Sequence, residues 1–84
     1  MTFEQIDEPV EVISYFDGAR MKPLRFRWRG RAYRVRSVNG VWSDIKGRVR
    51  ELHFHVSAVE SGSFELIYNH EHLAWRLGKA VLDG

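Results

Sequence analysis

The chain has 84 residues, no cysteine and a formal net charge of +2 at pH 7. A chain of this length forms one small domain, here residues 1–84, which buries only about 60% of the surface that its unfolded form exposes. The lack of cysteine excludes disulfides and thiolate metal sites and favours a cytoplasmic location. No apolar run reaches the length of a membrane span, so no membrane partner is expected.

The N-terminal segment is acidic and leads into a first predicted strand. Its start lacks the basic and apolar regions of a secretory signal. Residues 10–16 are rich in β-branched and aromatic side chains and are followed by Asp17 and Gly18, which predicts a strand that ends in a turn. The carboxylates of this segment are Glu4, Asp7, Glu8, Glu11 and Asp17.

Residues 22–36 carry the clearest pattern, because arginines alternate with apolar and aromatic residues on both sides of Gly30. A two-residue period is typical of a half-buried strand, and the glycine marks a tight turn, so this segment predicts a β-hairpin. A loop formed by Arg29 and Gly30 places Phe26 opposite Tyr33 on the apolar face.

The other face of this hairpin is basic. The same loop places Arg25 opposite Arg34, and a loop moved to Gly30 and Arg31 changes the pairs but keeps both faces. Like charges across a ladder destabilise by a few tenths of a kcal/mol up to roughly 1 kcal/mol, so solvent, neighbouring carboxylates or an anionic ligand should compensate for them. The predicted arginine face consists of Arg25, Arg27, Arg34 and Arg36, with Lys22, Arg29 and Arg31 at its rim.

The apolar positions of the hairpin also place Leu24 opposite Val35. Between Val35 and Val38 the apolar parity changes, which predicts a bulge or a strand end near Arg36 and Ser37.

Two further turns are predicted next. Asn39 and Gly40 lie between two valines and suit a type I′ hairpin turn, because both residue types tolerate positive φ. Lys46 and Gly47 mark the second turn.

The second half of the chain continues the strand pattern. Apolar residues alternate with histidine and serine from Leu52 to Val59, and residues 60–63 end this strand. Another alternating set spans residues 64–68, before a turn at residues 69–72. The predicted inward side chains are Leu52, Phe54, Val56, Ala58, Phe64, Leu66 and Tyr68.

The C-terminal segment has two interpretations. Leu73, Trp75 and Leu77 alternate as in a strand, whereas Leu73, Leu77, Ala80 and Val81 fit a helical stripe. We favour the strand and keep a short helix as the alternative.

Together these elements predict an all-β fold of about six short antiparallel strands in a meander. Such a meander forms a strongly bent sheet or a small, partly open barrel like that of SH3-like and OB-like modules. The three tryptophans, Trp28, Trp42 and Trp75, are in phase with other apolar residues. We therefore favour core anchors for all three and keep exposed binding aromatics as the alternative.

No motif predicts an enzyme. A phosphate-binding G-x-x-x-x-G-K-[ST] loop, a G-x-S-x-G nucleophile elbow and a cysteine nucleophile are all absent from the sequence. His53 and His55 lie on one face of a predicted strand, and His70 and His72 lie at a turn. Because no carboxylate or cysteine accompanies them at ligand spacing, we predict solvent-facing histidines, no metal site and no cofactor.

Several motifs give the chain a family resemblance. They are E-P-V-E-V at 8–12, F-x-W-x-G-x-x-Y-x-V at 26–35, F-E-L-I-Y at 64–68 and W-x-L at 75–77. The chain resembles an uncharacterised family of small bacterial domains, and also the C-terminal segment of some ImuB-type proteins, which are Y-family-polymerase-like accessory proteins of DNA damage tolerance. This resemblance implies an association with DNA repair and no catalytic role.

Two functional hypotheses follow. In the first, the arginine face contacts phosphates of DNA or RNA in a weak and strongly salt-dependent manner. In the second, the chain docks a repair or replication protein through a sheet edge or through the basic face. A structural alternative to both is that carboxylates such as Glu11 neutralise the arginines within the molecule.

Overall fold

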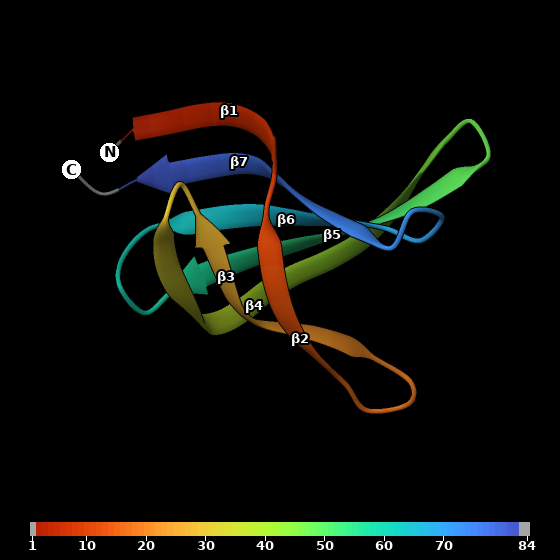
Figure 1. Ribbon diagram of the computed structural model, residues 1–84, viewed down its shortest axis with the longest axis horizontal. Coiled ribbons are helices and arrows are strands. Elements are labelled where there is room, and N and C mark those ends of the chain that lie inside the picture. Colours follow the sequence, from red (N-terminus) through yellow and green to blue (C-terminus); the bar gives the residue numbers. More distant parts are fainter. Residues whose placement is uncertain (1, 83–84) are drawn as a thin grey trace.

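The computed structural model describes residues 2–82, and this part of the chain forms seven β-strands and no helix (Figure 1). All neighbouring strands are antiparallel, in the order β1-β7-β6-β5-β4-β3-β2. The all-β prediction is therefore confirmed. The favoured C-terminal strand is also confirmed, and the alternative of a short helix is wrong. The strands are β1 (Thr2–Pro9), β2 (Glu11–Phe16), β3 (Met21–Trp28), β4 (Arg31–Lys46), β5 (Val49–Ala58), β6 (Ser63–Asn69) and β7 (Ala74–Leu82).

The additional strand is β1, which the sequence pattern did not indicate. Its half-buried positions are Glu4, Ile6 and Glu8, so only one of the three is apolar. Backbone pairing with β7 makes this segment a strand. Hydrogen bonding to a neighbouring strand does not require an alternating apolar pattern, so this strand leaves little signal in the sequence.

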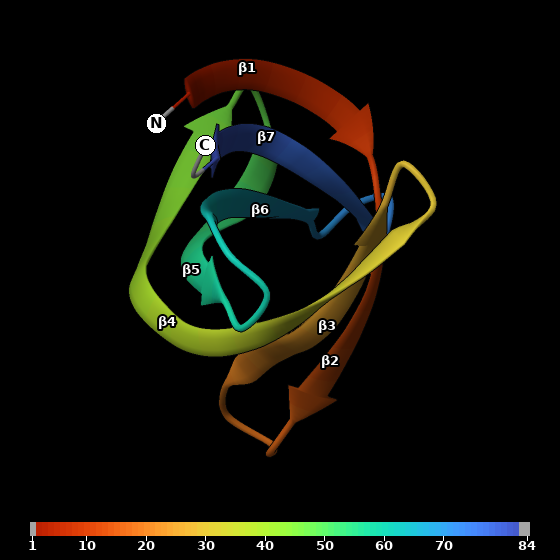
Figure 2. The ribbon, with the colours of Figure 1, turned by 90° about the vertical axis from the view of Figure 1, so that its left-hand side faces the viewer.

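The first two strands form opposite edges of the same sheet, and Val10 alone separates them. The Val10 amide donates a hydrogen bond to the Trp75 carbonyl (3.2 Å), after which the chain leaves β7 and pairs with β3. The sheet is strongly curled, but its two edge strands β1 and β2 do not pair with each other, so it does not close into a barrel (Figure 2). The expectation of a strongly bent sheet is confirmed.

Two bulges bend β4, which runs through 16 residues. The register with β5 shifts between Val35 and Ser37 and again between Val38 and Gly40, which leaves Arg36 and Asn39 as the extra residues. The first bulge confirms the prediction from apolar parity. The predicted hairpin turn at Asn39 and Gly40 is wrong, because this dipeptide lies inside a continuous strand.

Side-chain hydrogen bonds stabilise the second bulge. The Asn39 amide nitrogen donates to the Ser57 hydroxyl (2.8 Å), and the Ser37 hydroxyl donates to the Asn39 side-chain oxygen (2.9 Å). The actual hairpin turn follows Lys46, where Gly47 has a φ of 64° and Lys46 pairs with Val49. The turn predicted at Lys46 and Gly47 is therefore confirmed.

The hydrophobic core lies between the β3–β4 hairpin and one face of β5, β6 and β7. Phe64 is its centre, with its ring centroid 5.0 Å from those of Phe26 and Tyr33 and 6.2 Å from that of Trp28. The inward sets predicted for β5 and β6 are buried or half-buried as expected. The buried hydrophobic residues are Phe26, Trp28, Tyr33, Phe54, Val56, Ala58, Phe64, Leu66, Ile67, Leu77 and Ala80.

Two predictions about apolar side chains are wrong, one because of a bulge and one because of a turn. Ile13 pairs with Arg25 and Ser14 pairs with Pro23, so Leu24 is an extra residue; it is 40% exposed while Pro23 is buried. Leu73 has a positive φ in the turn before β7 and is also exposed.

A bulge in β7 accounts for the helix-like spacing near the C-terminus. The register between β6 and β7 shifts at Gly78, so the buried residues Leu77 and Ala80 are three positions apart on the same side of one strand. A Cβ at Gly78 would lie 2.5 Å from a Glu65 carboxylate oxygen, so the close approach of Glu65 favours glycine there.

Candidate nucleic-acid interface

The β3–β4 hairpin has the register that a loop of Arg29 and Gly30 predicts. Arg25 pairs with Arg34, and Phe26 pairs with Tyr33. Both loop residues have positive φ, 52° for Arg29 and 76° for Gly30, as a type I′ turn requires. The right-handed twist of this turn matches that of the flanking strands, so the loop fixes which side chains share a face.

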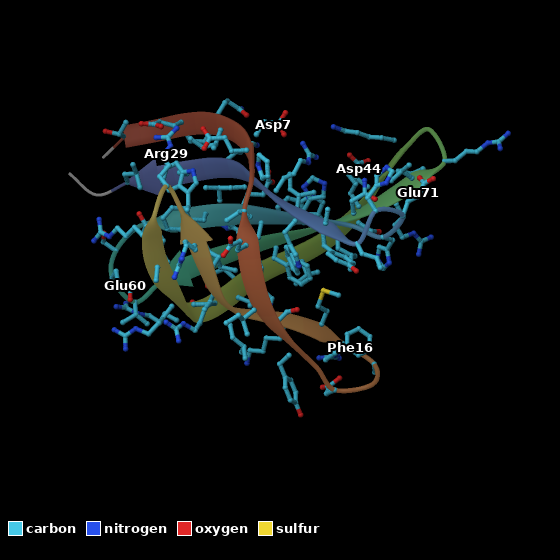
Figure 3. All side chains as sticks on the ribbon, viewed as in Figure 1. Asp7, Phe16, Arg29, Asp44, Glu60 and Glu71 are labelled. Atoms are coloured by element: carbon cyan, nitrogen blue, oxygen red, sulfur yellow. The ribbon has the colours of Figure 1, made fainter. Side chains whose placement is uncertain are left out.

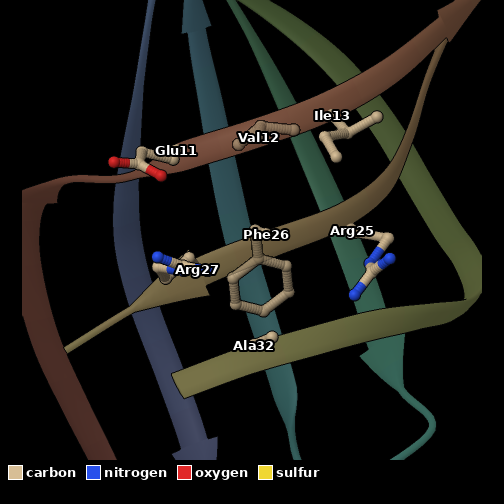
Figure 4. Close-up of a pocket in the computed structure, with 7 residues that line it drawn as sticks. All are labelled: Glu11, Val12, Ile13, Arg25, Phe26, Arg27 and Ala32. Atoms are coloured by element: carbon tan, nitrogen blue, oxygen red, sulfur yellow. The ribbon is translucent and has the colours of Figure 1, made fainter. Parts of the chain in front are cut away.

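The outer side of this hairpin is the predicted arginine face. Arg25, Arg27 and Arg34 are exposed and point away from the aromatic core. Strand β2 extends the surface, since it places Ile13 beside Arg25 and Glu11 beside Arg27 (Figure 4). These strands border an open hollow of about 500 Å³. Three antiparallel strands thus hold the arginine side chains at fixed spacing.

Arg34 is the arginine of this face that a carboxylate neutralises. The Glu60 carboxylate accepts a hydrogen bond from the Arg34 backbone amide (2.8 Å) and another from its guanidinium Nε (3.0 Å). These bonds lower the pKa of Glu60 to about 2. The ion pair relieves the repulsion between Arg34 and the directly opposite Arg25.

The other arginines of the face are not neutralised by the described carboxylates. Within residues 2–82, Arg25, Arg27 and Arg36 form no ion pair. Glu11 is opposite Arg27 in the β2–β3 register, but the two side chains form no ion pair. The predicted neutralisation by Glu11 and its neighbours is therefore wrong for these arginines, although Glu8 of the same acidic segment does form an ion pair with the rim residue Arg29.

The rim residues have different environments. The Arg29 guanidinium lies 4.4 Å from the Trp28 ring centroid and 2.8 Å from the Glu8 carboxylate, beside β1 (Figure 3). A hydrogen bond from Arg29 lowers the pKa of Glu8 most, and a hydrogen bond from Trp28 lowers it further. These contacts hold the tip of the hairpin against edge strand β1.

The two remaining rim residues are Arg31 and Lys22, at opposite ends of the arginine face. Arg31 pairs with Trp28 and has its guanidinium 5.3 Å from the Tyr33 ring centroid, so it extends over the aromatic side of the hairpin. Lys22 is exposed at the distal end of β3, opposite Tyr15.

The histidines do not form a metal centre within the described residues. His55 on β5 and His70 and His72 at the turn between β6 and β7 are exposed as predicted. The His53 side chain on β5 is only 12% exposed, so the prediction of a solvent-facing histidine is wrong for His53. No group of three or more histidine, aspartate or glutamate side chains in residues 2–82 has an arrangement that could hold a metal ion.

Trp42 has the exposed position that was the less favoured interpretation of the tryptophans. Trp28 is buried and Trp75 is half-buried, but Trp42 is 45% exposed, so the prediction of a core anchor is wrong for Trp42. Trp42 pairs with His53 on the face of β5 opposite the core. The second bulge of β4 sets this orientation, and the apolar pattern alone does not reveal it.

Comparison with known proteins gives a family but no described activity. No helix in residues 2–82 is long and apolar enough to cross a membrane. No curated protein and no solved structure matches the chain significantly. A family model described as a domain of unknown function, DUF6504, matches residues 1–80, and the chain therefore belongs to this family.

Proposed function

We propose that the protein is a non-catalytic nucleic-acid-binding module whose arginine face contacts phosphates. The observation that carries this proposal is the set of Arg25, Arg27 and Arg36, which are exposed and form no ion pair within residues 2–82. Arginine binds phosphate oxygens with up to two parallel hydrogen bonds. Strand β3 presents Arg25 and Arg27 on one face, and Arg36 follows at the first bulge of β4.

The expected binding is weak and depends steeply on salt. Each neutralised phosphate releases counterions, so log K falls with log salt at a slope of about −0.9 per contact on duplex DNA and about −0.7 on single strands. Three or four arginine contacts therefore predict slopes of roughly −2 to −4. Phosphate contacts carry no base information, so little sequence preference is expected from this face.

Fluorescence anisotropy with labelled single-stranded DNA, duplex DNA and RNA over a salt series tests the proposal. The double variant Arg25→Glu with Arg27→Glu should abolish binding at physiological salt while circular dichroism and the melting temperature show a folded domain. The matched control is Arg48→Glu with Arg50→Glu, which makes the same change in net charge at the exposed β4–β5 hairpin. If both double variants weaken binding equally, net charge alone governs it and the arginine face is not the site.

The cellular setting belongs to the same proposal. The resemblance to a segment of ImuB-type proteins supports a role beside DNA repair, and the lack of cysteine supports a cytoplasmic location. Loss of the gene should then sensitise cells to DNA damage, and restoration by the wild type but not by the arginine-face variant would support the link.

A second candidate is a protein-interaction module that uses edge strand β2. Exposed apolar side chains of this edge, Ile13, Tyr15 and Phe16, favour such a partner. Phe16 lies far along the β2–β3 hairpin (Figure 3). Tyr15→Ala with Phe16→Ala adds no charge and leaves Ile13 beside Arg25 in place. It should remove a repair or replication protein from a pull-down and leave anisotropy with DNA unchanged, whereas the arginine-face variant should do the reverse.

A further inference from the structure

The face of β5, β6 and β7 opposite the core forms the floor of a trough. Glu51, Glu65 and Ile67 belong to this face, yet they are only 5%, 8% and 6% exposed. They are covered because the sheet curls, so that the second half of β4 rises toward β1 (Figure 2). The trough holds two adjoining hollows of about 260 and 420 Å³, each lined from both β1 and β4. The larger hollow is near the lower end of the roughly 300–1,000 Å³ that is typical of ligand sites, and the smaller one is slightly below it.

Exposed aromatic rings stand on both walls of the smaller hollow. Phe3 projects from β1 and is 59% exposed, and Trp42 projects from β4 and is 45% exposed. Large exposed rings in a concave surface of a small domain are typical of a binding site, because burying them on a ligand releases much apolar surface from water.

The Trp42 ring is supported from below. It stacks on the His53 imidazole with centroids 5.3 Å apart and planes 17° from parallel. A supported ring loses little conformational freedom when a second flat group stacks on it.

Unused hydrogen-bonding groups lie in the floor. One Glu51 carboxylate oxygen and both His53 ring nitrogens are buried and have no hydrogen-bond partner. The His53 nitrogens lie 4.0 Å from Glu51 and 3.5 Å from Glu65. Glu65 lines both hollows. Its carboxylate can accept a hydrogen bond from an exocyclic amino group.

The charged side chains of the trough differ between its floor and its rim. Asp7 and Glu51 both bind Arg76, so these charges are largely used within the protein. Exposed Lys46 and Lys79 line the larger hollow, and Lys79 also lines the smaller one. The cations that remain for a partner therefore lie at the rim of the trough.

We propose that this trough binds an unpaired nucleobase of a single-stranded nucleic acid. The base stacks on Trp42, with Phe3 on the opposite wall and Glu65 as a hydrogen-bond acceptor in the floor. Lys79 and Lys46 contact the flanking phosphates. Bases inside a duplex are already stacked and cannot enter, so the trough selects single strands. This inference rests on the proposed function, because it gives the arginine-face module a preferred substrate.

The test compares single-stranded DNA with duplex DNA of the same sequence by anisotropy. Trp42→Ala should weaken single-strand binding by about 5- to 150-fold, the equivalent of 1–3 kcal/mol for a base stacked on an aromatic ring. Phe3→Ala should also weaken it, Trp42→Phe should retain most of it, and none of the three should alter duplex binding. The matched control is Phe16→Ala, which removes an exposed ring outside the trough.

The outcomes separate this inference from the arginine-face proposal. Normal single-strand binding by folded Trp42→Ala and Phe3→Ala would overturn the trough, even if the arginine-face variant had lost all binding. Conversely, full single-strand binding by the arginine-face variant with loss in Trp42→Ala would support the trough and overturn the arginine face. Equal loss of single-strand and duplex binding in Trp42→Ala would show a general effect on the fold and would contradict base stacking.

Discussion

Replacing Phe64 with alanine removes the central ring of the core and should lower the free energy of unfolding. Phe64 is 1% exposed and contacts three other rings, those of Phe26, Trp28 and Tyr33. A buried phenylalanine replaced by alanine costs about 3–5 kcal/mol. A domain of this length has a free energy of unfolding of roughly 4–13 kcal/mol at the usual values per residue, so this variant loses much of its stability.

Urea unfolding followed by tryptophan fluorescence, together with thermal melting, measures the effect. At about 4–8 °C per kcal/mol for a domain of this size, the melting temperature should fall by at least about 12 °C. The control Phe16→Ala removes the same side chain where it is 63% exposed, and it should change stability by no more than about 0.5 kcal/mol. A loss below about 1 kcal/mol for Phe64→Ala would refute the aromatic cluster as the centre of the core.

Three other variants test features outside the core. Hydrogen bonds from the Arg34 backbone amide and from its guanidinium lower the pKa of Glu60 from 4.5 to about 2. These contacts therefore stabilise the domain above pH 4.5 and lose that effect as the pH falls toward 2. The stability difference between wild type and Glu60→Gln, from urea unfolding at several pH values, should shrink over that interval, and a constant difference would contradict the pair. Gly18 and Gly62 both have positive φ, but only at Gly62 would a Cβ lie 2.9 Å from a backbone oxygen, that of Val81. Gly62→Ala should therefore lower the melting temperature more than Gly18→Ala, and equal effects would argue against this close approach. Glu8→Ala removes the side-chain link from β1 to Trp28 and Arg29. It should accelerate hydrogen exchange of β1 amides, and unchanged protection would show that pairing with β7 alone holds this edge.

Much of the candidate arginine face could be predicted because it depends on neighbours in the sequence. The alternation around Gly30 and the positive φ of the loop determine that Arg25 pairs with Arg34. Alternation likewise predicted the buried sides of β5 and β6. The ion pair of Arg34 with Glu60 was not predictable, because 26 residues separate the partners and the antiparallel pairing of β4 with β5 brings them together.

The amino-acid sequence by itself determined the all-β class, the central hairpin and its two faces, since side-chain period and turn chemistry act over a few residues. Only the tertiary structure decided that β1 is a strand, that Asn39 forms a bulge in β4 and that Trp42 faces a trough. Edge pairing, sheet curvature and the burial of the second face depend on strands that are distant in sequence. Those contacts exist only once the whole sheet has curled around its core.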